Sequence, residues 1–441
     1  MRETLFNPFI IFATGFLTVF FISISGAEEP IRGLTIDQAV GIALHENRDL
    51  MAARMEIEEA RGRLTQAGLF PNPVLDSNFS SDFAFGNEGE RSFSAGISQP
   101  IPLSGRIGAQ RRAARVDIKR TFADLANKER RLVRDVRRDF IEVLAIDEQI
   151  KLQDTLIDLN SDLVEAIKVG IKEGLASQKD LNAVAIALQQ ARQEREVLIS
   201  QRSSNILELD RLLGKPPTFS FLPEGNLEYR FPEHLAEYNA QTAFAKRPDL
   251  KFAELDAELA KANLGLAKAL RFEDITVGIS YQRDRTILDI PEGSIPNTDN
   301  LIGFKLTVPL PFFDRNQGRI AEARAREIRA EEGIEALKLE ISQEVNDALN
   351  RVNALAAILG TYESGILKAA EDNVKLVESG YRQGLAGITE VIQSRQQFAN
   401  LKSSYINAIR DYQIALNDLQ ISTGIYPSTI NFNETGEGEN K

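Results

Sequence analysis

Four short segments alternate apolar and polar side chains with a period of two, the pattern of a β-strand with one apolar face. In the clearest of them, Ile275, Val277, Ile279 and Tyr281 alternate with small polar residues and glycine. Their lengths are close to the roughly 9–11 residues with which a tilted strand crosses a bilayer. The four predicted strands are residues 74–85, 92–101, 275–282 and 302–308.

Two much longer segments carry apolar side chains at three- and four-residue spacing, which predicts helices with one apolar stripe. One helix is predicted to run without interruption from Gly318 to about Ser379, and its counterpart from Arg106 to Val169. Such a helix is roughly 90 Å long at 1.5 Å per residue, so it must pack side by side with another, as in a coiled coil. The stripe of the later helix consists of Ile334, Leu337, Ile341, Val345, Ala348, Val352, Leu355 and Leu359.

Nearly the same phrase ends each long helix, "VGIKEGLASQKDL" at 169–181 and "SGYRQGLAGITEV" at 379–391. A further helical segment follows each phrase, so the phrase is predicted to be the tip of an antiparallel helical hairpin. Glycine can adopt the positive φ that a tight helix–helix turn requires. The glycines expected in the two turns are Gly170, Gly174, Gly380 and Gly384.

The rest of the sequence also shows an internal duplication, which predicts two structural repeats. Each repeat is expected to contain short helices, a β-hairpin and a long helical hairpin, in that order. Thr35 and Gln38 form a capping box, and Asp49 and Asp249 are predicted to cap the second helix of each copy. The predicted divisions are a signal peptide (1–27), a first repeat (28–214), a linker (215–232), a second repeat (233–426) and a disordered tail (427–441).

The first residues have the composition of an export signal. Arg2 precedes an apolar run at 9–25, and small residues follow at 25–27. An uncleaved membrane anchor is the alternative interpretation. No later segment is long and apolar enough to predict a transmembrane helix, so we expect a secreted or envelope protein.

The composition excludes several classes of function. The net charge of −12 argues against a nucleic-acid partner, which would require a basic surface. The absence of Cys excludes disulfides, thiolate metal sites and a lipid anchor on an N-terminal Cys. With two His and no hydrolase, zinc-protease or nucleotide-binding motif, we expect no enzyme activity, no cofactor and no high-affinity metal site.

The predicted strands fit a membrane better than a soluble domain. A half-buried soluble sheet would show the same alternation. However, the chain carries an export signal, and no amphipathic element is left to cover the apolar faces. Four strands cannot close a barrel, because the smallest known have about eight, whereas three chains would supply twelve. A homotrimer is therefore expected, since open sheet edges are not tolerated in lipid.

Several strings then resemble a known family, the TolC-like outer-membrane efflux proteins. The strings "GRLTQAGLFPNPVL" (62–75), "SQPIPLSGR" (98–106) and "VPLPFFDRNQGRIAEA" (308–323) are most similar to its cobalt–zinc–cadmium resistance (CzcC-type) branch. The resemblance implies a mainly α fold in which a trimeric transmembrane β-barrel continues into a coiled-coil helical tunnel in the periplasm. "NRDL" at 47–50 departs from the family because it lacks the Pro that the second copy keeps as Pro248.

The resemblance also implies a function, a passive exit duct in the outer membrane for heavy-metal cations. An inner-membrane pump of the resistance-nodulation-division (RND) type and a periplasmic adaptor would deliver the substrate. The adaptor would contact the hairpin tips, and a constriction near the tips would form the gate. The implied contact residues are Gly170, Gly174, Leu175, Gly380, Gly384 and Leu385, and the implied gate residues are Asp180, Tyr381 and Glu390.

Other interpretations of these residues and of the whole chain stay open. Asp180 and Glu390 could simply cap the returning helices, since acids near a helix N-terminus are favourable. The duct of a type I protein secretion system or of a drug efflux system would have the same sequence features. A periplasmic adaptor is a weaker alternative, because it should have one helical hairpin and this chain has two.

One stretch of the first long helix is strongly basic. Residues 106–138 contain twelve Arg or Lys against four Asp or Glu. A solvated helix face is one explanation. Contact with phosphates of the inner leaflet is the other, since this helix would leave the membrane at Arg106.

Overall fold

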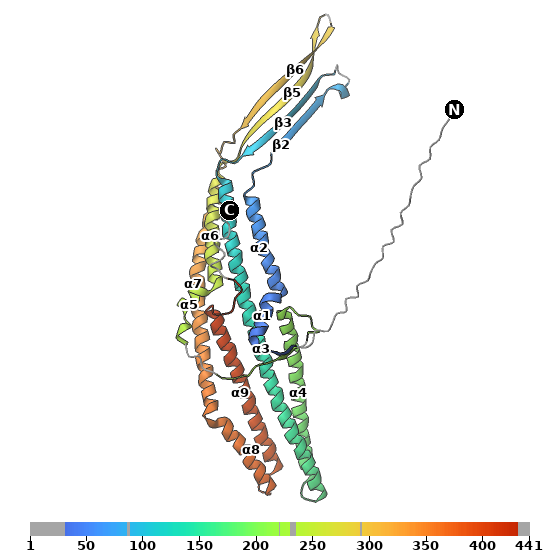
Figure 1. Cartoon of the computed structure of the whole chain (residues 1–441), viewed down its shortest axis with the longest axis vertical. Coiled ribbons are helices and arrows are strands. Elements are labelled where there is room, and N and C mark those ends of the chain that lie inside the picture. Colours follow the sequence, from blue (N-terminus) through green and yellow to red (C-terminus); the bar gives the residue numbers. More distant parts are fainter. Residues whose placement is uncertain (1–30, 86–88, 220, 230–234, 292, 431–441) are drawn as a thin grey trace, which may run out of the picture.

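The computed structural model describes residues 31–85, 89–219, 221–229, 235–291 and 293–430. The predicted signal peptide lies outside these residues. The described chain is a long rod with a β-sheet at one end and the turns of two helical hairpins at the other (Figure 1). Its elements are β1 (Ile31–Leu34), α1 (Ile36–Glu46), α2 (Arg48–Ala67), β2 (Val74–Ser81), a 3-10 turn (Phe83–Phe85), β3 (Arg91–Ile101), α3 (Arg106–Lys172), α4 (Gln178–Leu213), β4 (Phe221–Pro223), a 3-10 turn (Leu235–Glu237), α5 (Ala240–Lys246), α6 (Pro248–Ala269), β5 (Ile275–Ile290), β6 (Gly293–Thr307), α7 (Gln317–Thr361), a π-helical turn (Tyr362–Ile366), α8 (Leu367–Arg382) and α9 (Ile388–Ser422).

Strands β2, β3, β5 and β6 form one antiparallel sheet in that spatial order. Their register places Leu75, Ile97, Ile279 and Phe304 side by side on one face. These side chains are between 46% and 85% exposed, so no other described element covers them. The neighbouring row on the opposite face is polar or small and consists of Asp76, Gly96, Ser280 and Gly303. The sheet therefore has one bare apolar face and one polar face, as in a membrane-spanning strand.

The strands differ in length from the sequence prediction. β2 ends at Ser81, which pairs with Arg91 at the start of β3. The residues that follow form a 3-10 turn instead of a strand, because no β3 residue remains for them to pair with. β5 and β6 extend well past their predicted ends and pair as far as Ile290 and Gly293. Both faces of the extension are polar at 283–286 and 297–300, and further out apolar residues stand on both faces, for example Ile287 and Leu288, so no alternation reveals it.

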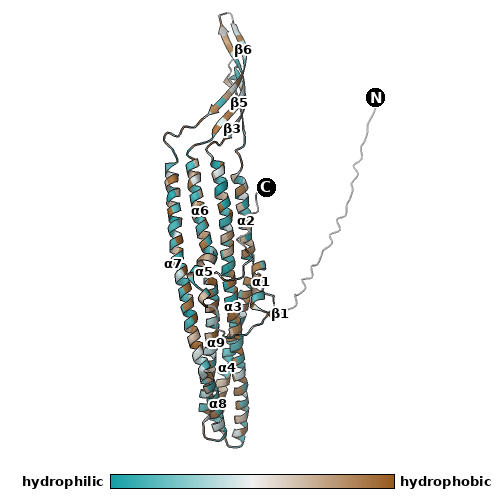
Figure 2. Cartoon of the chain, turned by 60° about the vertical axis from the view of Figure 1, so that its left-hand side comes forward, coloured by the Kyte–Doolittle hydropathy of each residue, from teal (hydrophilic) through white to brown (hydrophobic). Residues whose placement is uncertain are grey.

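Four helices, α2, α3, α6 and α7, continue from the sheet and lie side by side beneath it (Figure 2). Helix α3 is 67 residues long and runs unbroken to the far end of the rod, where α4 turns back along it. Hydrophobic and hydrophilic residues follow one another at short intervals along these helices, as the colouring of the ribbon in Figure 2 shows. None of the described helices is long and apolar enough to cross a membrane.

The second long helix is interrupted, contrary to the prediction of a continuous helix to Ser379. α7 ends at Thr361, and a π-helical turn that contains Gly365 at φ 113° separates it from α8. Ser364 Oγ donates a hydrogen bond to the Thr361 carbonyl at 2.6 Å, so it competes with the backbone pattern of the helix. A Gly–Ser pair is a common cause of a helix kink, and an apolar periodicity does not register it.

The capping predictions are right for the first helix and wrong for the second. Thr35 and Gln38 form the capping box of α1. Asn47, and not Asp49, caps α2, because its Oδ1 accepts the Leu50 N–H at 2.9 Å. The Asn47 amide also donates to the Leu212 carbonyl at 2.9 Å, which joins α2 to the end of α4. Asp49 lies one step further along, exposed in the first turn.

Asp249 does not cap α6 either, since the N-cap position is Arg247. Its carboxylate instead accepts hydrogen bonds from Arg247 (Nη2, 2.6 Å) and Arg130 (Nη2, 3.1 Å). Arg247 also contacts Glu344 at 2.6 Å and the Ser422 carbonyl at 3.1 Å. Burial disfavours the Asp249 carboxylate, but the hydrogen bond from Arg247 and the charge of Arg130 outweigh it, so the pKa of Asp249 is lowered. This cluster joins α3, α6, α7 and α9 in the middle part of the rod, where the two helical hairpins begin, a region that we call the waist.

Much of the basic stretch in α3 is engaged in ion pairs rather than solvated. Arg106 contacts Asp274 at 2.5 Å, and this hydrogen bond is the main cause of the lowered pKa of Asp274. Lys128 contacts Glu56 of α2 at 2.9 Å, and Arg120 contacts Asp256 of α6 at the same distance. The exposed remainder includes Arg111, Arg112 and Arg115.

The waist also holds the largest apolar cluster and the start of the predicted tail. In this cluster the short helices and β4 pack on α3 and α4 around Leu44, Leu213 and the fully buried Phe140. The predicted tail is bound at its start: Ser428 Oγ donates to the buried Glu129 carboxylate at 2.7 Å. Residues 431–441 lie outside the described part of the chain.

Asp210 of α4 is a buried carboxylate at the edge of this core, and its ionisation can be tested. It is 2% exposed, neither carboxylate oxygen has a hydrogen-bond partner among the described residues, and burial raises its pKa to about 6. Because this pKa is raised above the ordinary carboxyl value of about 4, ionisation of Asp210 destabilises the fold at neutral pH. The cost decreases as the pH falls through about 6, and it disappears only below about 4, where the group is protonated in the unfolded chain as well. We therefore expect Asp210→Asn to stabilise the protein by about 2–3 kcal/mol at pH 8, by roughly half as much at pH 5 and by almost nothing at pH 3.5.

Thermal unfolding of the wild type, of Asp210→Asn and of a control variant, measured across this pH range, checks the expectation. Asp158→Asn, at an exposed position of α3, is the control and should show no such pH dependence. A constant difference between wild type and Asp210→Asn at all pH values would contradict it.

Candidate gate and docking site at the hairpin tips

The two hairpin tips are the same turn built twice. Gly174 and Gly384 adopt positive φ angles of 75° and 73°. In the first tip the Gly170 carbonyl accepts the N–H groups of Leu175 (2.7 Å) and Ala176 (3.2 Å), which closes the turn after α3. The Gly380 carbonyl makes the equivalent bonds, of 2.8 and 3.3 Å, after α8. These bonds satisfy carbonyl groups that a helix end would otherwise leave unpaired.

Gly170 and Gly380 have a different role from the one predicted. Neither has a positive φ. A Cβ on Gly170 would lie 3.2 Å from the Cβ of Ala176, and one on Gly380 would lie 3.4 Å from that of Ala386. These glycines therefore allow the returning chain to approach the helix closely, while the following glycine supplies the left-handed conformation.

Leucine stands at the same place in both turns, directly after the left-handed glycine. Leu175 and Leu385 are each 80% exposed. A single exposed leucine needs no explanation, but this pair is repeated at the extreme end of the rod. The tips thus expose two equivalent apolar side chains.

The structure gives Asp180 a capping role. Ser177 caps α4, and its N–H and Oγ both donate to Asp180 Oδ2, at 3.0 and 2.7 Å. The Asp180 N–H in turn donates to Ser177 Oγ at 3.2 Å. Hydrogen bonds from Ser177 stabilise the carboxylate and lower the pKa of Asp180. The capping interpretation that the sequence left open is therefore present in the geometry.

Tyr381 and Glu390 are placed differently from Asp180. Tyr381 is half-buried at the tip, and burial, followed by the negative charge of Asp180, raises its pKa. Glu390 lies exposed in the first turn of α9, whose N-cap residue, Gly387, has no side chain to form a capping box. Within the described residues no hydrogen bond or ion pair engages the Glu390 carboxylate. Asp180 and Glu390 are thus equivalent in the repeat but not in their contacts.

An apolar cluster holds the two hairpins together just inside the tips. Its buried members, Ile167, Val184, Ile388 and Val391, come from α3, α4 and α9. Tyr381 packs against this cluster. The hairpins therefore lie against each other at their ends, so a movement of one must break contacts with the other.

Arg395 is a site residue that the sequence analysis missed. Its guanidinium contacts Glu378 of α8 at 2.7 Å and donates to the Leu159 carbonyl (2.9 Å) and Asn160 Oδ1 (3.2 Å) of α3. One buried side chain of α9 thus links the second hairpin to the first. A signal was available, because Arg395 occupies a position of the buried stripe formed by Val391 and Ala399.

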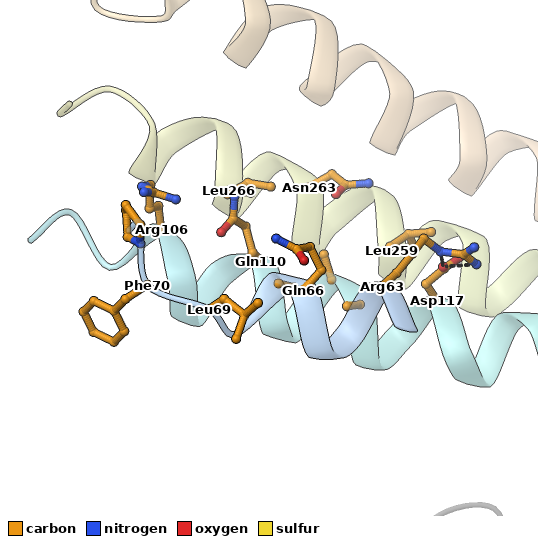
Figure 3. A pocket seen from close by; sticks show the side chains of 14 residues that line it. Arg63, Gln66, Leu69, Phe70, Arg106, Gln110, Asp117, Leu259, Asn263 and Leu266 are labelled. Carbon is orange, nitrogen blue, oxygen red and sulfur yellow. Dashed lines mark hydrogen bonds and ion pairs between the residues drawn. The ribbon is translucent and has the colours of Figure 1, made fainter. Parts of the chain in front are cut away.

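A groove also lies at the opposite end of the helices, next to the sheet. It lies between α2, α3 and α6, has a volume of about 680 Å³, and is lined mainly by amide and apolar side chains (Figure 3). Arg63 and Asp117 pair at 2.8 Å in it, and Phe70 lies at its sheet end. The described residues contain no group of three or more His, Asp or Glu side chains that could hold a metal ion.

Comparison with known proteins identifies the architecture. A family profile described as outer membrane efflux protein matches residues 39–215 and 239–424. The chain belongs to the outer membrane efflux protein family. It is a non-enzymatic efflux channel protein of the outer membrane, with its helices on the periplasmic side. The family, the fold class and the location predicted from the sequence are thereby confirmed.

Two curated relatives span nearly all of this efflux protein. The cobalt-zinc-cadmium resistance protein CzcC of Cupriavidus metallidurans is 23% identical over 87% of this chain and 88% of its own length. The pyoverdine export outer membrane protein OpmQ of Pseudomonas aeruginosa is 24% identical over 89% of this chain and 84% of its own. A crystal structure of CusC superimposes with a TM-score of 0.72 at 18% identity, covering 88% of this chain and 92% of that one.

The link through Arg395 can be tested directly. Arg395→Gln should destabilise the contact between the hairpins by about 2 kcal/mol, less than the roughly 3–5 kcal/mol for a fully buried pair, because Glu378 is 27% exposed. Faster amide hydrogen exchange at 155–185 and 375–400 would reveal the loss. Arg192→Gln, at an exposed position of α4, is the matched control. Unchanged exchange in Arg395→Gln would show that the apolar cluster alone holds the tips.

Proposed function

We propose that this efflux protein is the passive outer-membrane duct of a tripartite efflux system and that three copies form it. The observation that carries the proposal is the four-stranded sheet with a bare apolar face. Its edge strands, β2 and β6, have no partner beyond the sheet among the described strands. In lipid those backbone groups must be paired, and joining β6 of one copy to β2 of the next satisfies them.

The helices support the same closure. Beneath the sheet they follow the order of the strands, with α3 packed between α2 and α6, and α6 between α3 and α7. Helices α2 and α7 are therefore at the two edges, as β2 and β6 are in the sheet. Three copies would close twelve strands over a ring of twelve helices, a barrel that continues into a periplasmic tunnel. The match of the family profile to each half separately supports the proposed division into two repeats.

The proposed substrates are heavy-metal cations. The polar face of the sheet, which would line the barrel, carries Asp284 directly opposite Asp299, with Asp76 nearer the helices. Three copies would place rings of carboxylates around the exit, and such rings favour cations. Similarity to CzcC supports this substrate class. Similarity to OpmQ supports an organic substrate as the second candidate, and a duct for drugs or for type I protein secretion would share the architecture.

The proposed partners are an inner-membrane RND pump and a periplasmic adaptor. We assign the adaptor contact to the tips, because the turns expose the same apolar side chain twice at the end of the rod. The contact would comprise Leu175 and Leu385 with the turn glycines Gly170, Gly174, Gly380 and Gly384. The two leucines would supply the apolar part of this contact, next to exposed charged residues of the same turns, Lys172, Glu173 and Arg382.

The proposed gate uses Tyr381 and Glu390, with Asp180 as a supporting residue. Three copies of Glu390, each without an intramolecular partner in the described chain, would form an acidic ring at the inner end. Tyr381 lies against the cluster that joins the hairpins, so it can fix how closely they approach. Asp180 would act indirectly, through the start of α4 and its charge beside Tyr381.

Assembly is the first test of this proposal. Because isolated sheet edges are unstable in lipid, protein extracted in detergent should be a trimer that fractionates with the outer membrane. Chemical cross-linking and analytical ultracentrifugation measure this. A stable, water-soluble monomer would contradict the duct.

The gate is tested by planar-bilayer recording of the trimer. Glu390→Gln should lower cation selectivity, because it neutralises the ring, and Tyr381→Phe combined with Asp180→Ala should raise conductance. Glu173→Gln removes an exposed carboxylate from the first tip and serves as the control. Unchanged selectivity and conductance in all variants would mean that these residues only cap helices and that the gate lies elsewhere.

A further inference from the structure

Three arginines gather at the outer end of the apolar face of the sheet. Arg91 of β3 lies directly opposite Arg285 of β5 in the strand register. Arg283 is two residues from Arg285, on the same face, and lies opposite Phe93. All three side chains are exposed. Residues directly opposite in an antiparallel pair have Cβ atoms about 5 Å apart, so the Arg91 and Arg285 side chains share one patch.

No acidic side chain of the described chain forms an ion pair with any of the three arginines. Asp284 projects from the opposite face, where Ser92 Oγ and Gln282 donate to it at 2.6 and 2.8 Å. Glu90, beside Arg91 in sequence, accepts the Ile287 N–H at 3.3 Å. Like charges directly opposite each other on a sheet are destabilising. The protein therefore maintains an uncompensated cationic patch where one carboxylate would have removed the repulsion.

The height of this patch in the membrane follows from the strand register. Ile101 pairs with Ile275 at the helix end of the sheet, and Arg91 pairs with Arg285 ten residues further along both strands. Ten residues span about 34 Å along a strand, or about 25 Å of bilayer depth at the usual tilt of roughly 35–45°. That depth equals the typical height of the apolar band of an outer-membrane barrel, about 25 Å. The arginines thus stand at the outer edge of the band, at the level of lipid headgroups.

The neighbouring side chains also mark a change from hydrocarbon to headgroup at this level. Tyr281, one row below Arg283, donates its hydroxyl to Asn300 Oδ1 at 2.6 Å. Amphipathic aromatic residues typically stand at such an interface. Below this row the apolar face includes Ile279 and Phe304, whereas the next two rows above it contain the three arginines, Asn300 and Thr298, with Phe93 as the one apolar side chain.

We propose that Arg91, Arg283 and Arg285 bind the phosphate groups of an outer-leaflet glycolipid of the lipid A class. A guanidinium fits phosphate oxygens with two parallel hydrogen bonds, and it remains charged at any physiological pH. One phosphate between Arg91 and Arg285 would convert their repulsion into a bridge, and Arg283 can reach a phosphate or sugar hydroxyl of the same headgroup. The acyl chains of the lipid would then lie along the bare face formed by Phe93, Ile97 and Ile279.

The lipid site rests on the proposed function in one respect, because it requires that the apolar face contact lipid. It does not depend on the substrate, the gate or the partner proteins. A bound anionic lipid would fix the depth of the barrel in the outer leaflet and stabilise the edge of the sheet.

Binding is measured by native mass spectrometry of the detergent-solubilised trimer with added bis-phosphorylated lipid A. We expect the Arg91→Gln/Arg283→Gln/Arg285→Gln variant to bind it about tenfold more weakly or worse. Arg285→Lys, which keeps the charge, should retain part of the affinity. Lys305→Gln is the matched control, because Lys305 lies on the opposite, polar face of the same sheet, and it should bind as the wild type does. Lipid A stripped of its phosphates should bind weakly to every form.

The thermal midpoint of the trimer provides a second readout, because Arg285→Gln should change it in opposite directions without and with anionic lipid. In detergent without anionic lipid, Arg285→Gln should raise the thermal midpoint of the trimer, because it removes a like-charge pair. With lipid A present, the same substitution should lower the midpoint relative to wild type, since ligand binding stabilises only the form that binds. A shift of the same sign in both conditions would overturn the proposal.

Other results would also overturn the lipid site. Equal lipid A affinity in the triple variant and wild type, or equal losses in Lys305→Gln, would remove the role of the arginines. Binding of inorganic phosphate alone, with no preference for the lipid, would make the patch a site for free anions. If the wild type does not insert and trimerise, both the duct and the lipid site fail; if it does but the arginines are without effect, only the lipid site fails.

Discussion

The constraint on which this structure depends is that backbone N–H and C=O groups in a bilayer must be paired within the protein. The chain provides a sheet with apolar side chains on one face and unpaired edges at β2 and β6. Neither feature is stable for a single copy in water or in lipid. Closure with further copies, as proposed above, together with contact with lipid would satisfy the exposed side chains and the open edges at once. The long helices continue from these strands, so in the proposed trimer the same closure would also arrange them below the membrane.

Buried contacts at the waist join the two halves of the chain. Apolar clusters join the halves along the helices, and at the waist an ionic cluster is added to them: Arg130 of the first half and Arg247 of the second share the carboxylate of Asp249. The segment after α9 adds a further link through Glu129. Because the linked groups are buried, removal of one partner would leave an uncompensated charge. Such contacts define one arrangement of the repeats rather than a range of them.

The two hairpins share their turns but differ in ways that matter at the tip. The first is a continuous helix that returns through a capping box of Ser177 and Asp180. The second has a break at Gly365 and returns through Gly387, so Glu390 has no capping partner. Arg395 then joins the second hairpin to the first. The duplicated sequence thus yields one hairpin whose polar groups are used internally and another with a carboxylate available for function.

The sequence by itself determined the features that arise from periodicity and local chemistry. Alternation located the four strands, the helical stripe located the long helices, and the repeated phrase located both turns, because each pattern reflects the geometry of one element. The segments that resemble the efflux family (62–75, 98–106 and 308–323) identified the protein as an outer-membrane channel. The prediction failed where the pattern carries no signal: the outer part of the β5–β6 hairpin has no consistent apolar face, and the break at Gly365 leaves the apolar stripe intact.

Only the tertiary structure decided which of several chemically similar residues acts in a given place. Asn47 caps α2 in preference to Asp49 because its amide also reaches Leu212, 165 positions away. Asp249 was expected to cap a helix, yet it lies between two arginines that distant segments bring to it. Arg395 and the arginine patch on β3 and β5 depend on the pairing of segments more than 190 residues apart. Periodicity specifies the faces of an element, but the contacts between elements depend on packing and register, which no single segment contains.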